Sequence, residues 1–338
     1  MLPFLAEYGL FFAKTITIIL AILLIVAGII IIVSKNKDKM KGRLDIKNLN
    51  EKYDEMADQI RQEMLSKQEY KKTVKEIKKT KKQEAAAPAE KKRLFIIKFI
   101  GDIKASAVNS LREEITAILM VATINDEVVV ILDSPGGIVP NYGLAASQLE
   151  RIKQKNIPLT VAVDKVAASG GYLMACVANK ILAAPFAIIG SIGVVAQIPN
   201  FHRLLKKNDI DFEQITAGEF KRTLTLFGEN TEQGRKKVKD DVEDIQIIFK
   251  DFIKLNRPQV DTEAVATGEH WLAQRAFDLK LVDQLMTSDD YLQSFSNKAN
   301  LFEITYSHKK TLGEKISAAM QMAMDKTIHL FNKNSYFE

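Results

Sequence analysis

The chain has 338 residues, of which 47% are hydrophobic and 27% are charged, and its formal net charge is +6. That length suggests about two domains, or one large domain with extensions, and the composition excludes a wholly disordered chain, a collagen-like fibre and a polytopic transporter. The single cysteine, Cys176, excludes an intramolecular disulfide and a zinc site of the CxxC type.

The positive charge is concentrated in one segment. Residues 34–93 carry 19 Lys/Arg against 11 Asp/Glu, a net of +8, whereas residues 1–33 are neutral overall. Residues 94–338 therefore carry a net of −2. A net positive charge points to an anionic partner, but here it belongs to one segment near the N-terminus, and the large C-terminal part is close to neutral.

An uncharged apolar run of 19 residues extends from Thr15 to Val33. As a helix it would span about 28 Å, close to the hydrocarbon thickness of a bilayer. A signal peptide is the alternative, but its apolar core is usually about 7–15 residues long and is followed by a small-residue cleavage site. Here SKNKDKMKGR follows the run, so we predict a retained transmembrane helix at about residues 10–33 within an N-terminal segment, 1–33.

Residues 34–93 form a basic amphipathic and linker region. Residues 71–92 are rich in lysine, contain alanine and proline, and have no apolar period, which we interpret as a linker. A nucleic-acid-binding arm is the alternative, but a solvated tether near lipid headgroups needs no further assumption. Before the linker, apolar residues spaced by three and four predict an amphipathic helix or a short coiled coil: Leu49, Tyr53, Met56, Ile60 and Met64.

Apolar strand patterns alternate with helical patterns from residue 94 onward. This alternation predicts βαβ units around a largely parallel sheet, and hence one α/β domain over residues 94–290. A C-terminal extension over residues 291–338 adds a strand at 301–307 and an amphipathic helix at 312–331. Within the α/β domain we expect strands at 94–100, 127–133 and 159–164, helices at 109–122 and 142–154, and a long helix beginning near Thr231.

Three glycine-containing turns follow strand patterns, where α/β folds place their ligand sites. They are DSPGG (133–137), AASGG (167–171) and GSIG (190–193). In the second turn Ser169 lies between a strand and a helix, so its Oγ would sit at the positive helix end, as suits a nucleophile. The Gly170 N–H, with that of Gly136 or Gly137, could hold the oxyanion formed after attack. The alternative is that Ser169 is an ordinary helix N-cap.

A nucleophilic serine needs a base, and histidine is a weak candidate in this sequence. Of the four histidines only His270, in GEHW, has a suggestive setting, and a structural contact beside Trp271 explains it. Lysine can serve as the base when burial keeps it neutral. Lys221 lies between an expected strand and the long helix, among apolar residues that include Phe220 and Leu224. The alternative is a solvated loop lysine.

Five motifs in this order resemble the signal peptide peptidase A family: DSPGG, DKVAASGGYLMAC, APFAIIGSIGV, TAGEFKRTLT and ATGEHWLAQRAFDLKLVDQL. The resemblance covers nearly the whole chain and is weakest in residues 34–93 and after residue 300. It implies a Clp/crotonase-like fold and a serine endopeptidase that needs no metal or other cofactor. The closing motif departs from the family, which usually has a basic residue and Trp-Thr-Gly where this chain has GEHWLA, so any role of His270 stays open.

The resemblance also implies the roles of particular residues. Ser169 matches the nucleophile and Lys221 the general base of a Ser-Lys dyad, and Ser191 matches a serine that hydrogen-bonds the lysine amine. Gly136 and Gly170 match the positions whose amides form the oxyanion hole. In relatives with one copy of each motif the two dyad residues come from neighbouring subunits, so we expect a homo-oligomeric ring, such as an octamer.

The resemblance further implies peptide or unfolded-protein substrates, such as signal-peptide remnants or misfolded envelope proteins. We expect no nucleic-acid partner, because the basic segment is interpreted as a tether near lipid headgroups. Two other classes of function are weighed against it. A crotonase-like protein acting on acyl-CoA usually needs paired acidic residues near the oxyanion hole, and the three turns offer none. A non-catalytic membrane scaffold would be marked by loss of the serine or the lysine, and both are present.

The side of the membrane is open to two interpretations. The lysines directly after the apolar run, beginning at Lys35, favour a cytoplasmic catalytic domain by the positive-inside rule, and a lone free cysteine fits that side. The family resemblance favours the periplasmic face of the bacterial inner membrane. We expect a single-pass inner-membrane protein with a periplasmic catalytic domain.

Overall fold

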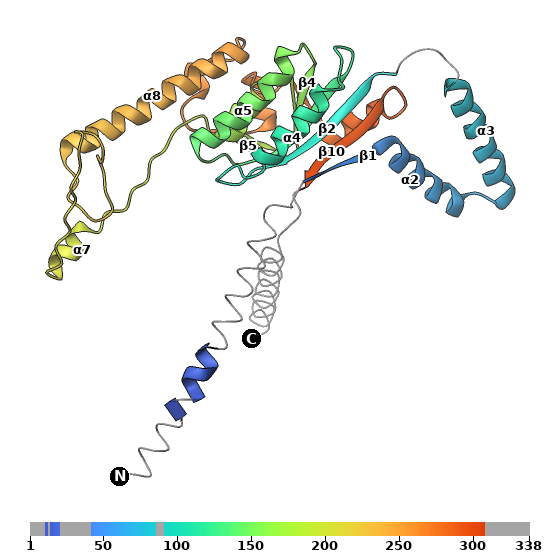
Figure 1. The fold of residues 1–338 in the computed structure, drawn as a ribbon. Helices are drawn as coiled ribbons and strands as arrows, with labels where there is room; N and C mark the ends of the chain where they lie inside the picture. Colours follow the sequence, from blue (N-terminus) through green and yellow to red (C-terminus); the bar gives the residue numbers. More distant parts are fainter. Residues whose placement is uncertain (1–10, 13, 21–41, 86–90, 308–338) are drawn as a thin grey trace, which may run out of the picture. The chain divides into compact units, whose positions relative to one another are not determined.

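The computed structural model describes residues 11–12, 14–20, 42–85 and 91–307 (Figure 1). The chain divides into two compact units, Met1–Leu44 with Tyr306–Glu338, and Asp45–Thr305. All of the candidate site residues lie in the second unit. Among the described residues no helix is long and apolar enough to cross a membrane. Most of the expected membrane helix and all of the expected helix at 312–331 lie outside these residues.

A seven-stranded sheet forms the centre of the fold, with strand order β1-β10-β2-β3-β4-β6-β9. Every neighbouring pair from β10 to β9 is parallel, which confirms the expected α/β class. The inner strands are buried along almost their whole length, as parallel strands covered on both faces must be. The strands are β1 (Arg43–Asn48), β2 (Arg93–Ile100), β3 (Glu127–Asp133), β4 (Leu159–Val163), β6 (Lys180–Ala183), β9 (Gln284–Leu285) and β10 (Asn300–Ser307).

A second, three-stranded sheet lies beside the carboxyl ends of the central strands. Its order is β5-β7-β8, with β5 (Val166–Ala168) parallel to β7 (Ile188–Gly190) and β8 (His270–Leu272) antiparallel to β7. An isolated parallel bridge between Ser134 and Ala167 joins the end of β3 to β5. The small sheet therefore gathers all three glycine-containing turns at one place.

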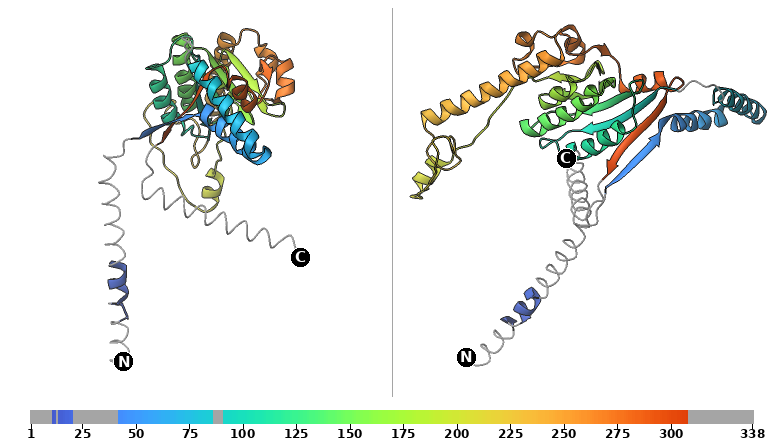
Figure 2. Two further views of the ribbon diagram at one scale, coloured as in Figure 1. Left: turned by 90° about the vertical axis from the view of Figure 1, so that its right-hand side faces the viewer. Right: turned by 45° about the horizontal axis from the view of Figure 1, so that its top comes forward.

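The helices expected wholly within the described residues are also present. Thr231 caps α8, its side chain accepting a hydrogen bond from the Gly234 N–H, which confirms the start predicted for the long helix. Figure 2 shows α8 running past the sheet, with the segment that carries α7 at its N-terminal end. The helices are α2 (Leu49–Met64), α3 (Lys67–Ala85), α4 (Val108–Leu119), α5 (Val139–Gln154), α6 (Gly170–Ala175), α7 (His202–Lys207), α8 (Glu232–Asn256), α9 (Thr262–Val265), α10 (Ala273–Asp278) and α11 (Ser288–Phe295).

The prediction of a linker at residues 71–92 is wrong up to Ala85, because α3 continues to that residue. The missed signal is a capping box at its start. The Glu69 carboxylate accepts a hydrogen bond from the Ser66 N–H at 3.1 Å, and the Glu69 N–H donates to Ser66 Oγ at 3.4 Å. Lysine, glutamate and glutamine are good helix formers, and a half-buried stripe through Tyr70, Val74 and Ile77 supplies the apolar period.

The strand expected before Lys221 is absent from the described structure. Residues 195–231, which we term the arm, contain α7 and otherwise run as turns and loops to the start of α8. At the other end of α8 the buried Arg257 guanidinium donates to both carboxylate oxygens of Asp283, at 2.9 and 2.6 Å. That carboxylate also accepts from the Ile181 N–H of β6. The C-terminal end of α8 is thus held to the central sheet.

Candidate active site

Ser169 is held in an unusual backbone conformation between β5 and α6. Its φ of 52° and ψ of −119° lie where non-glycine residues are rare. Its N–H donates to the Gly190 carbonyl at 2.8 Å, and its carbonyl accepts from the Leu173 N–H at 3.0 Å. The Ser169 side chain makes no capping hydrogen bond, so the N-cap alternative does not describe this serine.

The DSPGG turn lies directly against Ser169. Ser134 exchanges two backbone hydrogen bonds with β5, from its N–H to Val166 and from the Ala168 N–H to its carbonyl. Gly136 has a φ of +87°, and a Cβ placed there would lie 2.7 Å from the Gly170 nitrogen and 2.8 Å from Ser169 Cβ. Only glycine satisfies both the backbone conformation and this close approach.

Two of the glycine amides near Ser169 have no acceptor among the residues that the structure describes. Gly170 is the first residue of α6, where a helix leaves its N–H groups unpaired. Gly137 is exposed and lines the same cavity as Ser169, and in the described part of the chain its N–H has no hydrogen-bond partner. By contrast the Gly136 N–H donates to Ser134 Oγ at 3.2 Å. The oxyanion role of Gly136 stays a prediction, with Gly137 as the second candidate.

The GSIG turn supports Ser169 from the other side. Gly190 provides the carbonyl that accepts from Ser169, and a Cβ there would lie 2.8 Å from the Trp271 ring. Ser191 is half-buried with a φ of 49°, and its N–H donates to Glu269 at 2.6 Å. His270 is paired with Gly190 across β7 and β8, and its side chain is exposed. The last of the five motifs, which contains Glu269, His270 and Trp271, therefore supports the GSIG turn that contacts Ser169.

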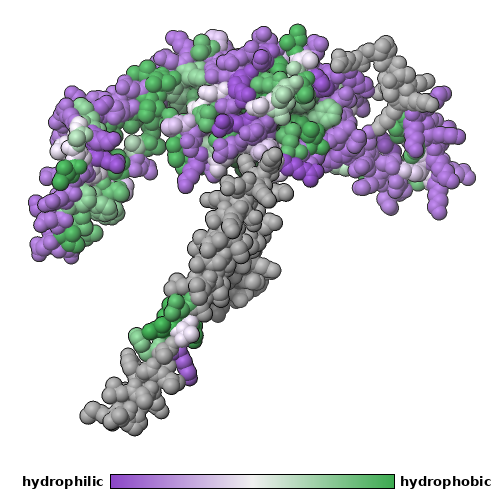
Figure 3. All heavy atoms as spheres, in the orientation of Figure 1, coloured by the Kyte–Doolittle hydropathy of each residue, from purple (hydrophilic) through white to green (hydrophobic). Residues whose placement is uncertain are grey.

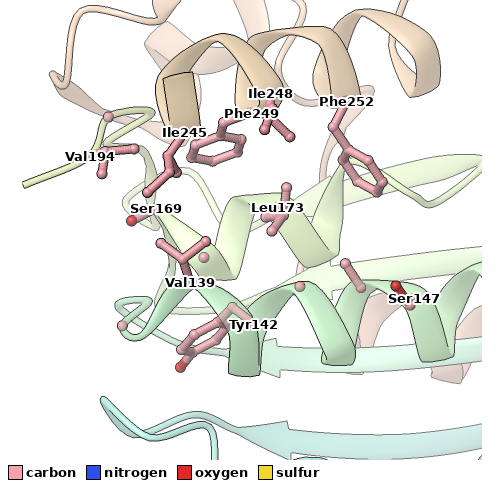
Figure 4. Close-up of a pocket in the computed structure, with 15 residues that line it drawn as sticks. Val139, Tyr142, Ser147, Ser169, Leu173, Val194, Ile245, Ile248, Phe249 and Phe252 are labelled. Atoms are coloured by element: carbon pink, nitrogen blue, oxygen red, sulfur yellow. The ribbon is translucent and has the colours of Figure 1, made fainter. Parts of the chain in front are cut away.

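An apolar cavity of about 290 Å³ opens beside Ser169. Figure 4 shows side chains of α5, α6 and α8 converging on it, with Leu173 of α6 between the other two helices. Its walls offer few polar groups beyond Ser169, Ser147 and backbone amides. The remaining lining residues are Gly137, Val139, Tyr142, Gly143, Ala146, Gly170, Gly193, Val194, Ile245, Ile248, Phe249 and Phe252.

Lys221 does not reach this cavity within one chain. Its segment lies at the start of α8, since Gln233 donates to Glu219 at 2.8 Å and a Cβ at Gly234 would collide with the Thr223 carbonyl. The residues of α8 that line the cavity begin at Ile245, which is eleven residues after Gly234 and therefore about 16 Å further along the helix.

Of the apolar neighbours expected to desolvate Lys221, Phe220 is exposed and Leu224 is half-buried, and the lysine itself is exposed. One chain therefore assembles the serine, the glycine turns and the cavity, and holds the lysine apart from them.

A cysteine nucleophile and a metal site find little support among the described residues. Cys176 is fully buried at the end of α6, and burial raises the pKa of its thiol far above the usual range, so the thiol stays protonated. No group of three or more His, Cys, Asp or Glu side chains in the described part of the chain is arranged to hold a metal ion.

The fold and the site define a mixed α/β protein that presents a strained serine beside free backbone amides. Two family models match the chain, "Peptidase family S49 N-terminal" over residues 3–149 and "Peptidase family S49" over residues 151–302. The chain belongs to peptidase family S49, a family of serine proteases, and this confirms the family that the motifs indicated.

Individual relatives match over nearly the whole chain. A Haemophilus influenzae protein described as "Probable protease SohB" is 49% identical, covering 97% of this chain and 96% of the relative. A protein of the same description from Buchnera aphidicola subsp. Schlechtendalia chinensis is 47% identical, covering 87% of this chain and all of the relative. Among solved structures, a mutant membrane-bound stomatin-specific protease with a substrate peptide is 14% identical, with a TM-score of 0.44 over 69% of this chain and 99% of that one.

Proposed function

We propose that this chain is a membrane-anchored serine endopeptidase that cleaves peptides through a dyad of Ser169 and Lys221. The observation that carries the proposal is the presentation of Ser169 in a strained turn, beside glycine amides and at an apolar cavity. Membership of a serine protease family supports the same reaction class, and a Clp/crotonase-like arrangement of the parallel sheet is part of the proposal.

The reaction is acyl transfer. Neutral Lys221 takes the Ser169 Oγ proton while Oγ bonds to the peptide carbonyl carbon, and the oxyanion is held by Gly170 and the DSPGG turn. The C–N bond then breaks and the lysine proton passes to the leaving amine. Water hydrolyses the acyl-enzyme with Lys221 again as base, returning a proton to Ser169. Ser191 hydrogen-bonds the lysine amine and orients it.

The dyad is shared between subunits of a homo-oligomeric ring, such as an octamer. The arm supports this shared dyad, because it separates Lys221 from Ser169 of the same chain. It also exposes many large apolar side chains, with Ile215 96% exposed. Apolar side chains are visible on the segment around α7 (Figure 3). An apolar surface of this extent marks a protein–protein interface. Packing the arm on a second copy would bury both this surface and the Lys221 amine.

The substrates are peptides or unfolded segments with apolar side chains next to the scissile bond, because the cavity beside Ser169 is lined mainly by apolar residues. Signal-peptide remnants and misfolded envelope proteins have this chemistry. The anchor is the apolar run at residues 15–33, in the bacterial inner membrane with the catalytic domain on the periplasmic side. Lysine-rich residues 34–93 lie near the lipid headgroups.

Labelling with a peptidyl phosphonate, which reacts with activated serines, tests the proposed nucleophile and base. We expect Ser169→Ala to abolish both labelling and peptide cleavage, and Lys221→Ala to abolish both as well, because the serine then has no base. Ser147→Ala is the matched control, because Ser147 lines the same cavity and should label normally. Labelling that survives in Ser169→Ala or in Lys221→Ala would overturn the dyad.

The cavity wall predicts the substrate preference. Ile248→Asp puts a charge on the α8 wall of the cavity, and we expect kcat/KM for peptides with Leu or Phe before the scissile bond to fall about tenfold or more. Ile247→Asp is the control, since Ile247 is exposed on the same helix but does not line the cavity. Equal losses in the two variants would contradict the assignment of this cavity to the substrate.

A further inference from the structure

A buried hydrogen-bond chain lies beneath the candidate oxyanion hole. The Tyr142 hydroxyl donates to the Asp102 carbonyl at 2.7 Å and lies 2.6 Å from Ser134 Oγ. The Tyr142 hydroxyl has one proton, and it donates this proton to the Asp102 carbonyl. The Ser134 hydroxyl must therefore donate to the Tyr142 oxygen. Ser134 Oγ is then free to accept the Gly136 N–H at 3.2 Å. Every proton in this chain has an acceptor, and the side chains of Ser134 and Tyr142 are fully buried.

The Tyr142 ring also lies under the second candidate donor. A Cβ added at Gly170 would collide with Tyr142 Cγ, so the ring and the first residue of α6 are in close contact. Figure 4 shows the ring on α5 below Ser169, with its hydroxyl directed away from α8. The same side chain therefore touches the Gly170 position through its ring and the DSPGG turn through its hydroxyl.

We propose that Tyr142 is a positioning residue that holds both halves of the oxyanion hole against Ser169, Gly170 through its ring and the DSPGG turn through Ser134. The inference rests on the proposed function and assigns a role to two residues outside the dyad. Its physical basis is that Gly137 of the DSPGG turn is exposed, and that within the described part of the chain the glycine amides of this turn make one hydrogen bond, from Gly136 to Ser134 Oγ. A displacement of about 1 Å at such a donor is enough to cost roughly a hundredfold in rate.

The test is Tyr142→Phe, which keeps the ring that supports Gly170 and removes only the hydroxyl. We expect kcat to fall about tenfold or more with KM nearly unchanged, because the donors act on the transition state and not on the bound peptide. The affinity of a peptide boronate, which mimics the tetrahedral intermediate, should fall by the same factor. Peptide binding to Tyr142→Phe in a Ser169→Ala background should match that of Ser169→Ala alone.

Tyr172→Phe is the matched control. Tyr172 is equally buried and its hydroxyl donates to the Leu281 carbonyl at 3.1 Å, but it does not line the cavity. It should lose thermal stability comparable to that of Tyr142→Phe and keep its kcat. Ser134→Ala is a second variant, and its effect on kcat should not add to that of Tyr142→Phe, because both break one chain.

The outcomes separate the two proposals. Loss of kcat in Tyr142→Phe no greater than in Tyr172→Phe, or a change confined to KM, would overturn the positioning role while Ser169→Ala remains inactive. Additive effects of Ser134→Ala and Tyr142→Phe would also overturn it. Activity that survives in Ser169→Ala would overturn the proposed function itself.

Discussion

Mixing Ser169→Ala chains with Lys221→Ala chains is expected to restore peptidase activity that neither variant has alone. Each substitution removes one half of a catalytic unit and should lower kcat by about 10³-fold or more. Within one chain the Lys221 segment lies at the start of α8, far from the cavity beside Ser169. If each site takes its serine and its lysine from neighbouring subunits, a random equal mixture keeps both groups in roughly a quarter of its sites.

The experiment needs mixed assemblies and a control for them. Co-expression of the two variants with different affinity tags, followed by sequential purification, isolates assemblies that contain both chains. Ser169→Ala paired with the Ser169→Ala, Lys221→Ala double variant should stay inactive, because no subunit then supplies a serine. If doubly tagged assemblies of the two single variants also stay inactive, the shared dyad is contradicted.

Gly136→Ala is expected to remove nearly all activity from a protein that still folds. The added methyl group would lie 2.7 Å from the Ala168 carbonyl oxygen, 2.7 Å from the Gly170 nitrogen and 2.8 Å from Ser169 Cβ. These are backbone or near-backbone atoms that cannot rotate away, so the turn and the nucleophile must separate. Because oxyanion donors act only at correct distances, we expect kcat to fall by about 10²-fold or more.

Gly268→Ala separates this collision from backbone strain. Gly268 has the same φ of +87°, but a Cβ there meets nothing within 4 Å. Both variants should lose about 1–2 kcal/mol of stability from the left-handed conformation, measured by urea unfolding. Only Gly136→Ala should lose kcat. A comparable loss of kcat in Gly268→Ala would mean that strain, and not contact with Ser169, explains the effect.

Local patterns predicted most of the second unit. The strand expected at 127–133 is β3 with the same ends, and the helix expected near Thr231 begins with that residue as its cap. These elements were predictable because buried parallel strands are continuous apolar runs, and because caps depend on residues only three positions apart. A capping box of Ser66 and Glu69 marks the start of α3 in the same way. It was missed because the many lysines in that segment favoured the interpretation as a linker.

The candidate site was predictable only in part. The turns carrying Gly136, Ser169 and Gly190 could be identified along the chain, and the structure brings them together through β5 and β7. Tyr142 was missed, since nothing nearby in the sequence relates a helical tyrosine to the Asp102 carbonyl or to Ser134. Ser134 is fully buried, and a buried hydroxyl must find a partner, but its burial is known only from the tertiary structure.

By itself the sequence determined the alternation of strands and helices in the α/β domain, the family, the basic segment of net charge +8 and the motif around Ser169. Each depends on residue types at short spacings, which can be read from the chain directly. Only the tertiary structure showed that α8 forms one wall of an apolar cavity and that Tyr142 lies under Gly170. It also showed that Lys221 is held away from the serine of its own chain. These depend on contacts between distant segments, and such contacts are set by how the helices pack on the sheet.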